Sequence, residues 1–95
     1  MEIKNIFRCE AQSNYTQFYF KDGTKILVSK TLKGYENILS DLHFFRINRS
    51  QLVNLKCIKI VGRQRNPAVS LDNETELVMS SFRKCEFFKK MGKVI

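Results

Sequence analysis

The chain has 95 residues, of which 43% are hydrophobic and 27% charged, and this composition predicts one small globular domain. Lys and Arg outnumber Asp and Glu by 17 to 9, so the formal net charge of +8 predicts a polyanionic partner. A single His and the lack of a CxxC pair leave little material for a metal site or a catalytic base, so neither an enzyme nor a bound cofactor is expected.

The three cysteines, Cys9, Cys57 and Cys85, lie far apart in the sequence and have no His partners. They predict buried, unreactive thiols rather than a redox or metal site. The sequence begins without a signal peptide, and no apolar run approaches the ~20 residues of a membrane span. A cytoplasmic location is therefore expected.

The first third of the chain predicts an antiparallel meander. Residues 2–9, 15–20 and 24–28 are rich in β-branched and aromatic side chains, which favour strands. Asp22 and Gly23, between the last two segments, form a pair that is typical of a tight hairpin turn.

Residues 31–42 change the period of the hydrophobic pattern and predict an amphipathic helix. Ser29 or Thr31 is expected to cap its N-terminus. The apolar side chains recur every three or four residues and share one helical face: Leu32, Tyr35, Ile38, Leu39 and Leu42.

The second half of the chain predicts strands at 44–46 and 52–61 and a hairpin at 67–71 and 75–79. Residues 81–91 predict a terminal helix, whose apolar side chains recur three apart at Phe82, Cys85, Phe88 and Met91. The expected fold class is mainly β with α: about seven short antiparallel strands, one central helix and a C-terminal helix, in a single domain.

The basic residues are concentrated around 46–49, between 56 and 65, and from 83 onward. These stretches can attract phosphate groups, although a merely solvated surface is the alternative explanation. The second hairpin is expected to face away from a nucleic-acid backbone, because it carries three acidic residues: Asp72, Glu74 and Glu76.

Three stretches narrow the function: CEAQSNYT at residues 9–16, VSKTLKGYENIL at 28–39 and FFRINRSQLVNL at 44–55. Together they resemble the LytTR family, whose pattern runs as EA-x-x-NYT, VSKTLK and F-x-R-x-HRS-x-LVNL-x-x-I. The agreement extends through Ile58. Three matches in the right order are far more specific than any one of them.

The resemblance implies a bacterial DNA-binding domain built as an elongated stack of short antiparallel β-sheets. In that family, loops rather than a recognition helix enter successive major grooves of double-stranded DNA and bend the duplex. The sites are commonly direct repeats, each bound by a separate copy. The resemblance further implies regulation of transcription under an upstream receiver domain with its sensor kinase, or under a membrane inhibitor.

The resemblance also assigns site residues in three loops. Base readout is expected from Asn14, Thr16, Asn48, Arg49 and Arg83, and phosphate contacts from Ser13, Arg46, Ser50 and Ser81. Outside the resemblance, the charges of Lys30 and Lys84 are expected to add non-specific attraction to phosphate. The chemistry of these side chains agrees, because guanidinium groups can pair with guanine and carboxamides with adenine, while hydroxyl and ammonium groups suit phosphate oxygens.

Each assignment has a structural alternative. Asn14 and Asn48 could hold turn geometry, and Arg46 suits a salt bridge or a phosphate-positioning contact better than base readout. The neighbouring apolar side chains are expected in the core: Tyr15, Phe44, Phe45, Leu52, Val53 and Leu55.

The sequence departs from the family pattern at three points. Asn48 replaces a common His, and Gly34 stands where a Glu often completes a capping box, which predicts a loose first helical turn. The strand that opens the family's domain is expected to be short or absent. The chain is therefore expected to be either a domain excised from a receiver-containing regulator or a stand-alone regulator.

A different class of function remains an alternative, namely a basic protein-interaction or single-stranded RNA-binding module that uses exposed aromatic side chains. The run of alternating Gly and aromatic residues that marks RNA-recognition motifs is missing from the sequence. The sequence therefore favours duplex DNA.

Overall fold

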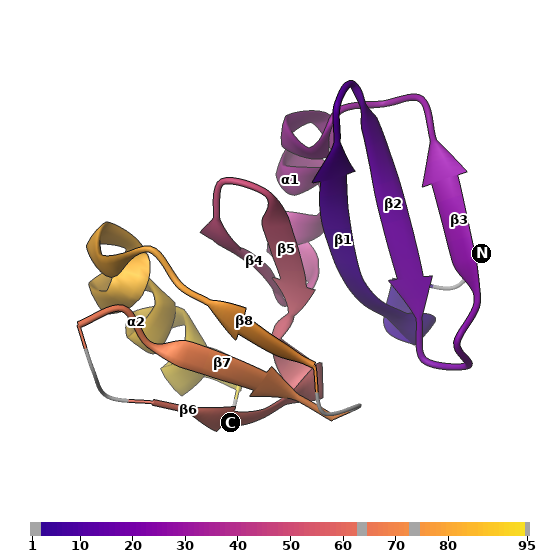
Figure 1. Ribbon diagram of the computed structural model, residues 1–95. Coiled ribbons are helices and arrows are strands. Elements are labelled where there is room, and N and C mark those ends of the chain that lie inside the picture. Colours follow the sequence, from indigo (N-terminus) through magenta and orange to yellow (C-terminus); the bar gives the residue numbers. More distant parts are fainter. Residues whose placement is uncertain (1–2, 63–64, 73–74, 95) are drawn as a thin grey trace.

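A computed structural model describes residues 3–62, 65–72 and 75–94, which form two antiparallel sheets and two α-helices (Figure 1). The sheets have the strand orders β3-β2-β1-β5-β4 and β6-β7-β8. The strands are β1 (Ile6–Gln12), β2 (Tyr15–Phe20), β3 (Lys25–Val28), β4 (Phe44–Asn48), β5 (Gln51–Asn54), β6 (Ile58–Val61), β7 (Ala68–Leu71) and β8 (Glu76–Val78). The helices are α1 (Leu32–Leu39) and α2 (Lys84–Val94). The predicted fold class is confirmed, with eight strands in the described residues rather than about seven.

The N-terminal meander is confirmed, since β1, β2 and β3 pair in antiparallel order, but its first strand spans Ile6–Gln12 rather than the predicted residues 2–9. Gly23 closes the β2–β3 turn with a φ of 91°, a conformation that glycine adopts at little cost. Asp22 Oδ1 accepts a hydrogen bond from Thr24 N at 2.9 Å, which fixes the same turn. A 3₁₀ turn (Ile3–Asn5) precedes β1, which carries the Glu-Ala pair of the family motif.

The five-stranded sheet is covered on both faces along β1, β4 and β5. One buried cluster joins it to α1 and consists of Ile6, Cys9, Phe18, Leu32, Leu39, Phe44 and Leu52. The other joins it to the three-stranded sheet and α2 and consists of Phe7, Phe45, Ile47, Val53, Leu55, Cys57, Val69, Leu71, Met79 and Phe87. Phe44 and Phe45 thus lie in different cores. Because β4 and β5 are buried on both faces, their sequences contain consecutive apolar residues instead of an alternation of apolar and polar residues. Tyr15 is 48% exposed, so its predicted place in the core is wrong.

Helix α1 is capped at its N-terminus by Thr31, whose hydroxyl accepts a hydrogen bond from Gly34 N at 3.4 Å. The α-helix ends at Leu39, earlier than predicted, and the chain continues through a 3₁₀ turn (Ser40–Leu42). Leu42 lies in this turn and Ile38 at the border of the apolar face. They are 42% and 51% exposed, whereas the sequence pattern placed both on the buried face.

The long strand predicted at 52–61 is wrong, because the chain leaves one sheet and enters the other in the middle of it. A 3₁₀ turn (Leu55–Cys57) separates β5 from β6. Asn54 is buried at this break, where its Oδ1 accepts from Lys56 N at 3.0 Å and its Nδ2 donates to Ile6 O at 2.9 Å. The carboxamide therefore satisfies the backbone groups that an uninterrupted strand would have paired.

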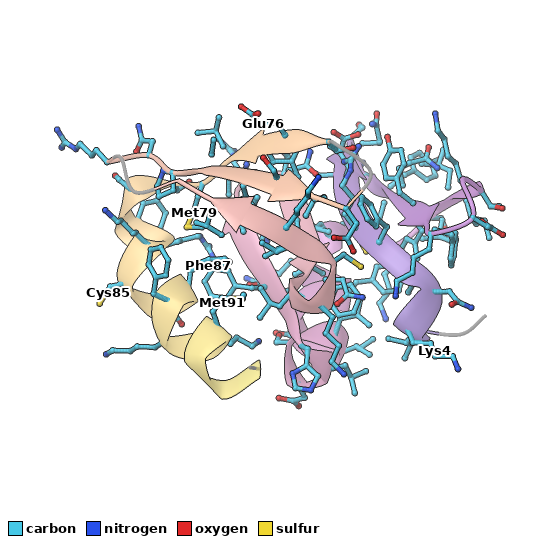
Figure 2. The ribbon with its side chains drawn as sticks, turned by 90° about the horizontal axis from the view of Figure 1, so that it is seen from below. Lys4, Glu76, Met79, Cys85, Phe87 and Met91 are labelled. Carbon is cyan, nitrogen blue, oxygen red and sulfur yellow. The ribbon has the colours of Figure 1, made fainter. Side chains whose placement is uncertain are left out.

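The terminal helix is confirmed, but its apolar side chains do not pack as one row spaced three apart: Met91 packs against the core, whereas Cys85 is exposed. Figure 2 shows Met79, Phe87 and Met91 pointing into the space between α2 and the sheets, and Phe87 is fully buried. Phe82 and Phe88 are exposed instead. A strict spacing of three residues drifts around an α-helix with 3.6 residues per turn, so it did not identify the face that packs.

Two of the three cysteines are buried as predicted. Burial raises the pKa of the Cys9 thiol to about 12, although the charge of Arg8 opposes the shift, and burial likewise raises the pKa of Cys57. Cys85 is exposed and points away from the body of the molecule in Figure 2, so its predicted burial is wrong.

The second hairpin is confirmed by the pairing of β7 with β8. Val78, at the end of β8, contacts Asn48, so Glu76 at the start of β8 lies at the end of the hairpin that points away from the β4–β5 turn, and Glu74 lies outside the described residues. Neither of the two helices in the described part of the chain is long and apolar enough to cross a membrane.

Candidate nucleic-acid interface

Three segments lie along one edge of the molecule (Figure 1): the β1–β2 turn (residues 12–15), the β4–β5 turn (48–51) and the connection from β8 to α2 (78–83). Glu10 of β1 pairs with Gln51 of β5, and this register places the first two turns at the same end of the five-stranded sheet. We call the three segments together the loop edge.

Hydrogen bonds fasten the three segments to one another. Ala11 N donates to Ser50 O at 2.9 Å and so joins the first turn to the second. Ser80 N donates to Ile47 O at 2.8 Å, which joins the third segment to β4. The spacing of the loop edge is therefore set by the fold.

The first turn presents Ser13 and Asn14, and both are exposed. Ser13 has a φ of 58°, the left-handed conformation that a tight turn between antiparallel strands requires. Thr16 is different, since it is fully buried and its hydroxyl donates to Lys30 O at 2.7 Å. The prediction that Thr16 reads a base is therefore wrong, because its hydroxyl ties β2 to the residue before the helix cap.

Polar side chains surround the Glu10 carboxylate behind the first two turns. Gln51 Nε2 donates to Glu10 Oε2 at 2.7 Å, while Tyr19 Oη and Gln12 Nε2 each donate to Oε1 at 3.0 Å. The Arg8 guanidinium stacks 3.8 Å from the centroid of the Tyr19 ring, and its Nη1 donates to Gln51 Oε1 at 2.8 Å. We call these five residues the Glu10 cluster.

The surrounding hydrogen-bond donors and the positive charge of Arg8 favour the ionised form of Glu10. Burial alone would raise the pKa of Glu10, but the hydrogen bonds from Gln51, Tyr19 and Gln12 and the charge of Arg8 together hold that pKa below its ordinary value. The carboxylate therefore links β1, β2 and β5 at neutral pH.

The second turn presents Arg49 and Ser50, both of which are exposed. Asn48 holds the turn in place, because its Oδ1 accepts from Ser50 N at 2.9 Å and its Nδ2 donates to Val78 O at 2.6 Å. These contacts favour the structural alternative for Asn48 over base readout.

Arg46 lies behind the second turn and is 17% exposed. Its Nη1 is 3.1 Å from Glu36 Oε1, and its Nη2 donates to Arg49 O. Arg46 therefore connects α1 to the turn, as the salt-bridge alternative predicted, and its position does not fit the predicted phosphate contact.

The third segment contains a 3₁₀ turn (Ser81–Arg83) in which Ser81 and Phe82 are exposed and Arg83 is half-buried. Arg83 Nη1 donates to Arg46 O at 2.9 Å. A guanidinium has five N–H donors, so this bond orients the group without exhausting its capacity to donate. Lys84 follows directly and is half-buried.

Lys30 is exposed, and its ammonium lies 5.4 Å from the centroid of the Tyr35 ring. Its stem crosses Gly34, where an added Cβ would lie 3.0 Å from Lys30 Cε. The glycine that departs from the family pattern therefore makes room for the Lys30 side chain, and the capped first turn forms in spite of it.

Part of the basic charge lies away from the loop edge. Lys56 is exposed in the 3₁₀ turn that follows β5, at the end of β5 opposite to the second turn. Lys90 Nζ donates to Ser40 O and to Phe44 O, both at 2.6 Å, and burial lowers its pKa against the opposing effect of nearby carboxylates. Net charge alone therefore does not define the candidate surface.

Sequence reasoning missed the Glu10 cluster and the exposure of Phe82. Glu10 lies inside the quoted motif, but its partners Tyr19 and Gln51 come from other strands, and only the register brings them together. Phe82 is 80% exposed because its 3₁₀ turn precedes the α-helical part, and no periodicity in the sequence marks that change.

Among the described residues, no group of three or more His, Cys, Asp or Glu side chains could hold a metal ion.

The sequence model of the LytTr DNA-binding domain matches residues 1–92. A solved structure described as the LytTr DNA-binding domain of a methyl-accepting/DNA response regulator from Bacillus cereus is similar, with a TM-score of 0.85 and 22% identity over 97% of this chain and 85% of that chain. No curated protein matches the sequence. The chain therefore belongs to the LytTr family, a family of DNA-binding domains and not of enzymes.

Proposed function

We propose that the chain binds double-stranded DNA in a sequence-specific manner through the loop edge and thereby regulates bacterial transcription. The observation that carries this proposal is the row of three segments that hydrogen bonds hold together, with Asn14 and Arg49 exposed on it. Membership in a DNA-binding family and the net charge of +8 support a nucleic-acid partner.

The dimensions of the molecule support a contact with more than one groove. Its longest principal dimension is 34 Å, and one turn of B-DNA is also about 34 Å long. A row of loops along such a body can reach two successive major grooves on one side of a duplex.

Different residues of the loop edge have different proposed roles. Arg49 and Arg83 pair with guanine and Asn14 with adenine, because their side chains match the hydrogen-bonding groups of those bases in the major groove. The first turn carries no charged side chain, so its contacts are neutral hydrogen bonds. Phosphate contacts come from Ser13, Lys30, Ser50, Ser81 and Lys84.

The proposal extends to the assembly around the domain. Direct repeats in the DNA would bind two copies of the chain, one on each repeat. In the cytoplasm, the activity of the domain would be set by an upstream receiver domain and its sensor kinase, or by a membrane inhibitor.

The test starts with selection of bound duplexes from a random pool. Arg49→Ala should weaken binding to the selected duplex by about 5- to 100-fold and binding to random duplex much less, because it removes a base contact. Lys84→Ala is the matched control and should weaken both by a similar factor.

Two results would contradict the proposed function. Equal losses on selected and random duplexes for Arg49→Ala would remove its role in base readout. Tighter binding of the wild type to single-stranded RNA than to any duplex would favour the RNA-binding alternative.

A further inference from the structure

Phe82 has the most exposed large hydrophobic side chain in the described part of the chain, at 80%. Val78, at the end of β8, is 58% exposed. Both line one shallow hollow of the loop edge, together with the carboxamide residue Asn48 and the hydroxyl residue Ser81. The loop edge therefore carries an apolar tip within a polar surrounding.

The tip is held next to the proposed base contacts. Arg83 follows Phe82 directly, its Cζ lies 5.5 Å from the centroid of the Phe82 ring, and it is fastened to Arg46 O. Asn48 fastens Val78 through its backbone oxygen. These bonds hold the backbone that carries Val78 and Phe82 next to the second turn and to Arg83.

The surroundings of the tip indicate what it contacts. A Phe side chain that is 80% exposed leaves a large apolar area in water, and such an area is commonly covered by a partner. None of the described residues that line the hollow is acidic, and two basic side chains, Arg83 and Lys84, follow Phe82. This charge suits a polyanion, and the apolar feature of the DNA major groove is the C5-methyl group of thymine.

We infer that Phe82, supported by Val78, contacts a thymine methyl group in the major groove beside the base that Arg83 reads. Phe82 is then a specificity-determining residue, which adds apolar recognition of thymine to the hydrogen bonds of the arginines. This inference rests on the proposed function, because it requires the loop edge to lie on duplex DNA.

The test uses deoxyuridine, which lacks the C5-methyl group of thymidine but pairs in the same way. In a duplex selected with the wild-type chain, each thymine is replaced in turn by uracil. Replacement of the contacted thymine should weaken wild-type binding about fourfold, the effect of one buried methyl group. Phe82→Ala should bind the thymine duplex at least fourfold more weakly and should no longer distinguish the two duplexes.

Two further variants control the result. Phe82→Leu keeps an apolar tip and should retain the preference for thymine over uracil. Leu27→Ala removes an apolar side chain that is 53% exposed on β3, which is the edge strand of the sheet farthest from β4, and should change neither the affinity nor the preference.

Three outcomes would overturn the inference. If a duplex is selected but Phe82→Ala keeps the wild-type preference, or if no uracil replacement weakens the wild type, Phe82 does not read thymine and the proposed function still stands. If no duplex is selected at all, both the inference and the proposed function are wrong.

Discussion

The two halves of the loop edge are held in place by different kinds of interaction. The first two turns belong to the five-stranded sheet, and the Glu10 cluster joins their strands through a half-buried carboxylate. The third segment is fastened to β4 by hydrogen bonds and backed by α2, whose Phe87 lies in the apolar core.

This difference indicates which kind of substitution should destabilise each half of the loop edge. A carboxylate cluster depends on charge and therefore on pH, whereas a segment backed by a packed helix depends on apolar volume. Substitutions in the two halves should consequently have distinguishable signatures, and three of them follow in order of decreasing expected effect.

The largest effect is expected for Phe87→Ala. Removing a fully buried ring leaves a cavity between α2 and the sheets and should lower the free energy of unfolding by about 3 to 5 kcal/mol. Urea denaturation measures the change. Phe88→Ala is the matched control, since Phe88 is 42% exposed, and a loss as large for Phe88 as for Phe87 would contradict the assignment of the packed face.

A smaller effect is expected for Lys90→Met, which keeps the length of the side chain but removes its donor. Ser40 O and Phe44 O would lose their charged partner, at an expected cost of about 1 to 3 kcal/mol in unfolding free energy. Lys89→Met removes the same charge from an exposed neighbour and should change stability by less than about 0.5 kcal/mol. Equal losses in thermal or urea unfolding would show that Lys90 does not anchor α2.

The smallest effect is expected for Glu10→Gln, about 1 kcal/mol at neutral pH, because one oxygen acceptor is replaced by a donor that faces other donors. The signature is its pH dependence. Because the folded-state pKa of Glu10 lies below its ordinary value of about 4.3, its contribution is present above that pH and lost as pH falls through the folded-state value.

Urea denaturation of wild type and Glu10→Gln between neutral and acidic pH measures this difference. The two unfolding free energies should converge as the carboxyl group becomes protonated. Glu76→Gln removes one negative charge from an exposed position on β8 and is the control. A gap between wild type and Glu10→Gln that stays constant over the whole range would show that the Glu10 charge does not stabilise the cluster.

Local chemistry made several elements predictable. Asp22 and Gly23 specify a tight turn through backbone conformation, and Thr31 caps α1 through its own hydroxyl. Both effects act within a few residues of the chain, so the sequence alone was sufficient to place the meander and the start of the helix.

Features set by contacts between distant segments were not predictable in the same way. The break after β5 depends on the bond from Asn54 to Ile6 O, and the burial of Thr16 depends on Lys30 O. Because β4 and β5 are covered on both faces, their apolar runs contained no signal of where the chain changes sheets. The exposure of Phe82 likewise follows from a 3₁₀ turn that no periodicity in the sequence marks.

The candidate site shows the same division. The family motif placed Asn14, Arg49 and Ser50 on exposed turns, where the structure has them. It could not distinguish Asn48 and Arg46 from these residues, although their polar groups are engaged in holding the second turn. Side chains that hold the second turn in place and side chains that are exposed on it alternate in the sequence. Only the contacts in the structure show which side chain belongs to which group.

The central claim, that the loop edge is the DNA-binding surface, is tested most directly by amide chemical-shift changes during titration of the labelled chain with a selected duplex. The account predicts that the largest changes fall in residues 12–15, 48–51 and 78–83. Changes concentrated instead on β3 and around Lys56, away from the loop edge, would contradict it.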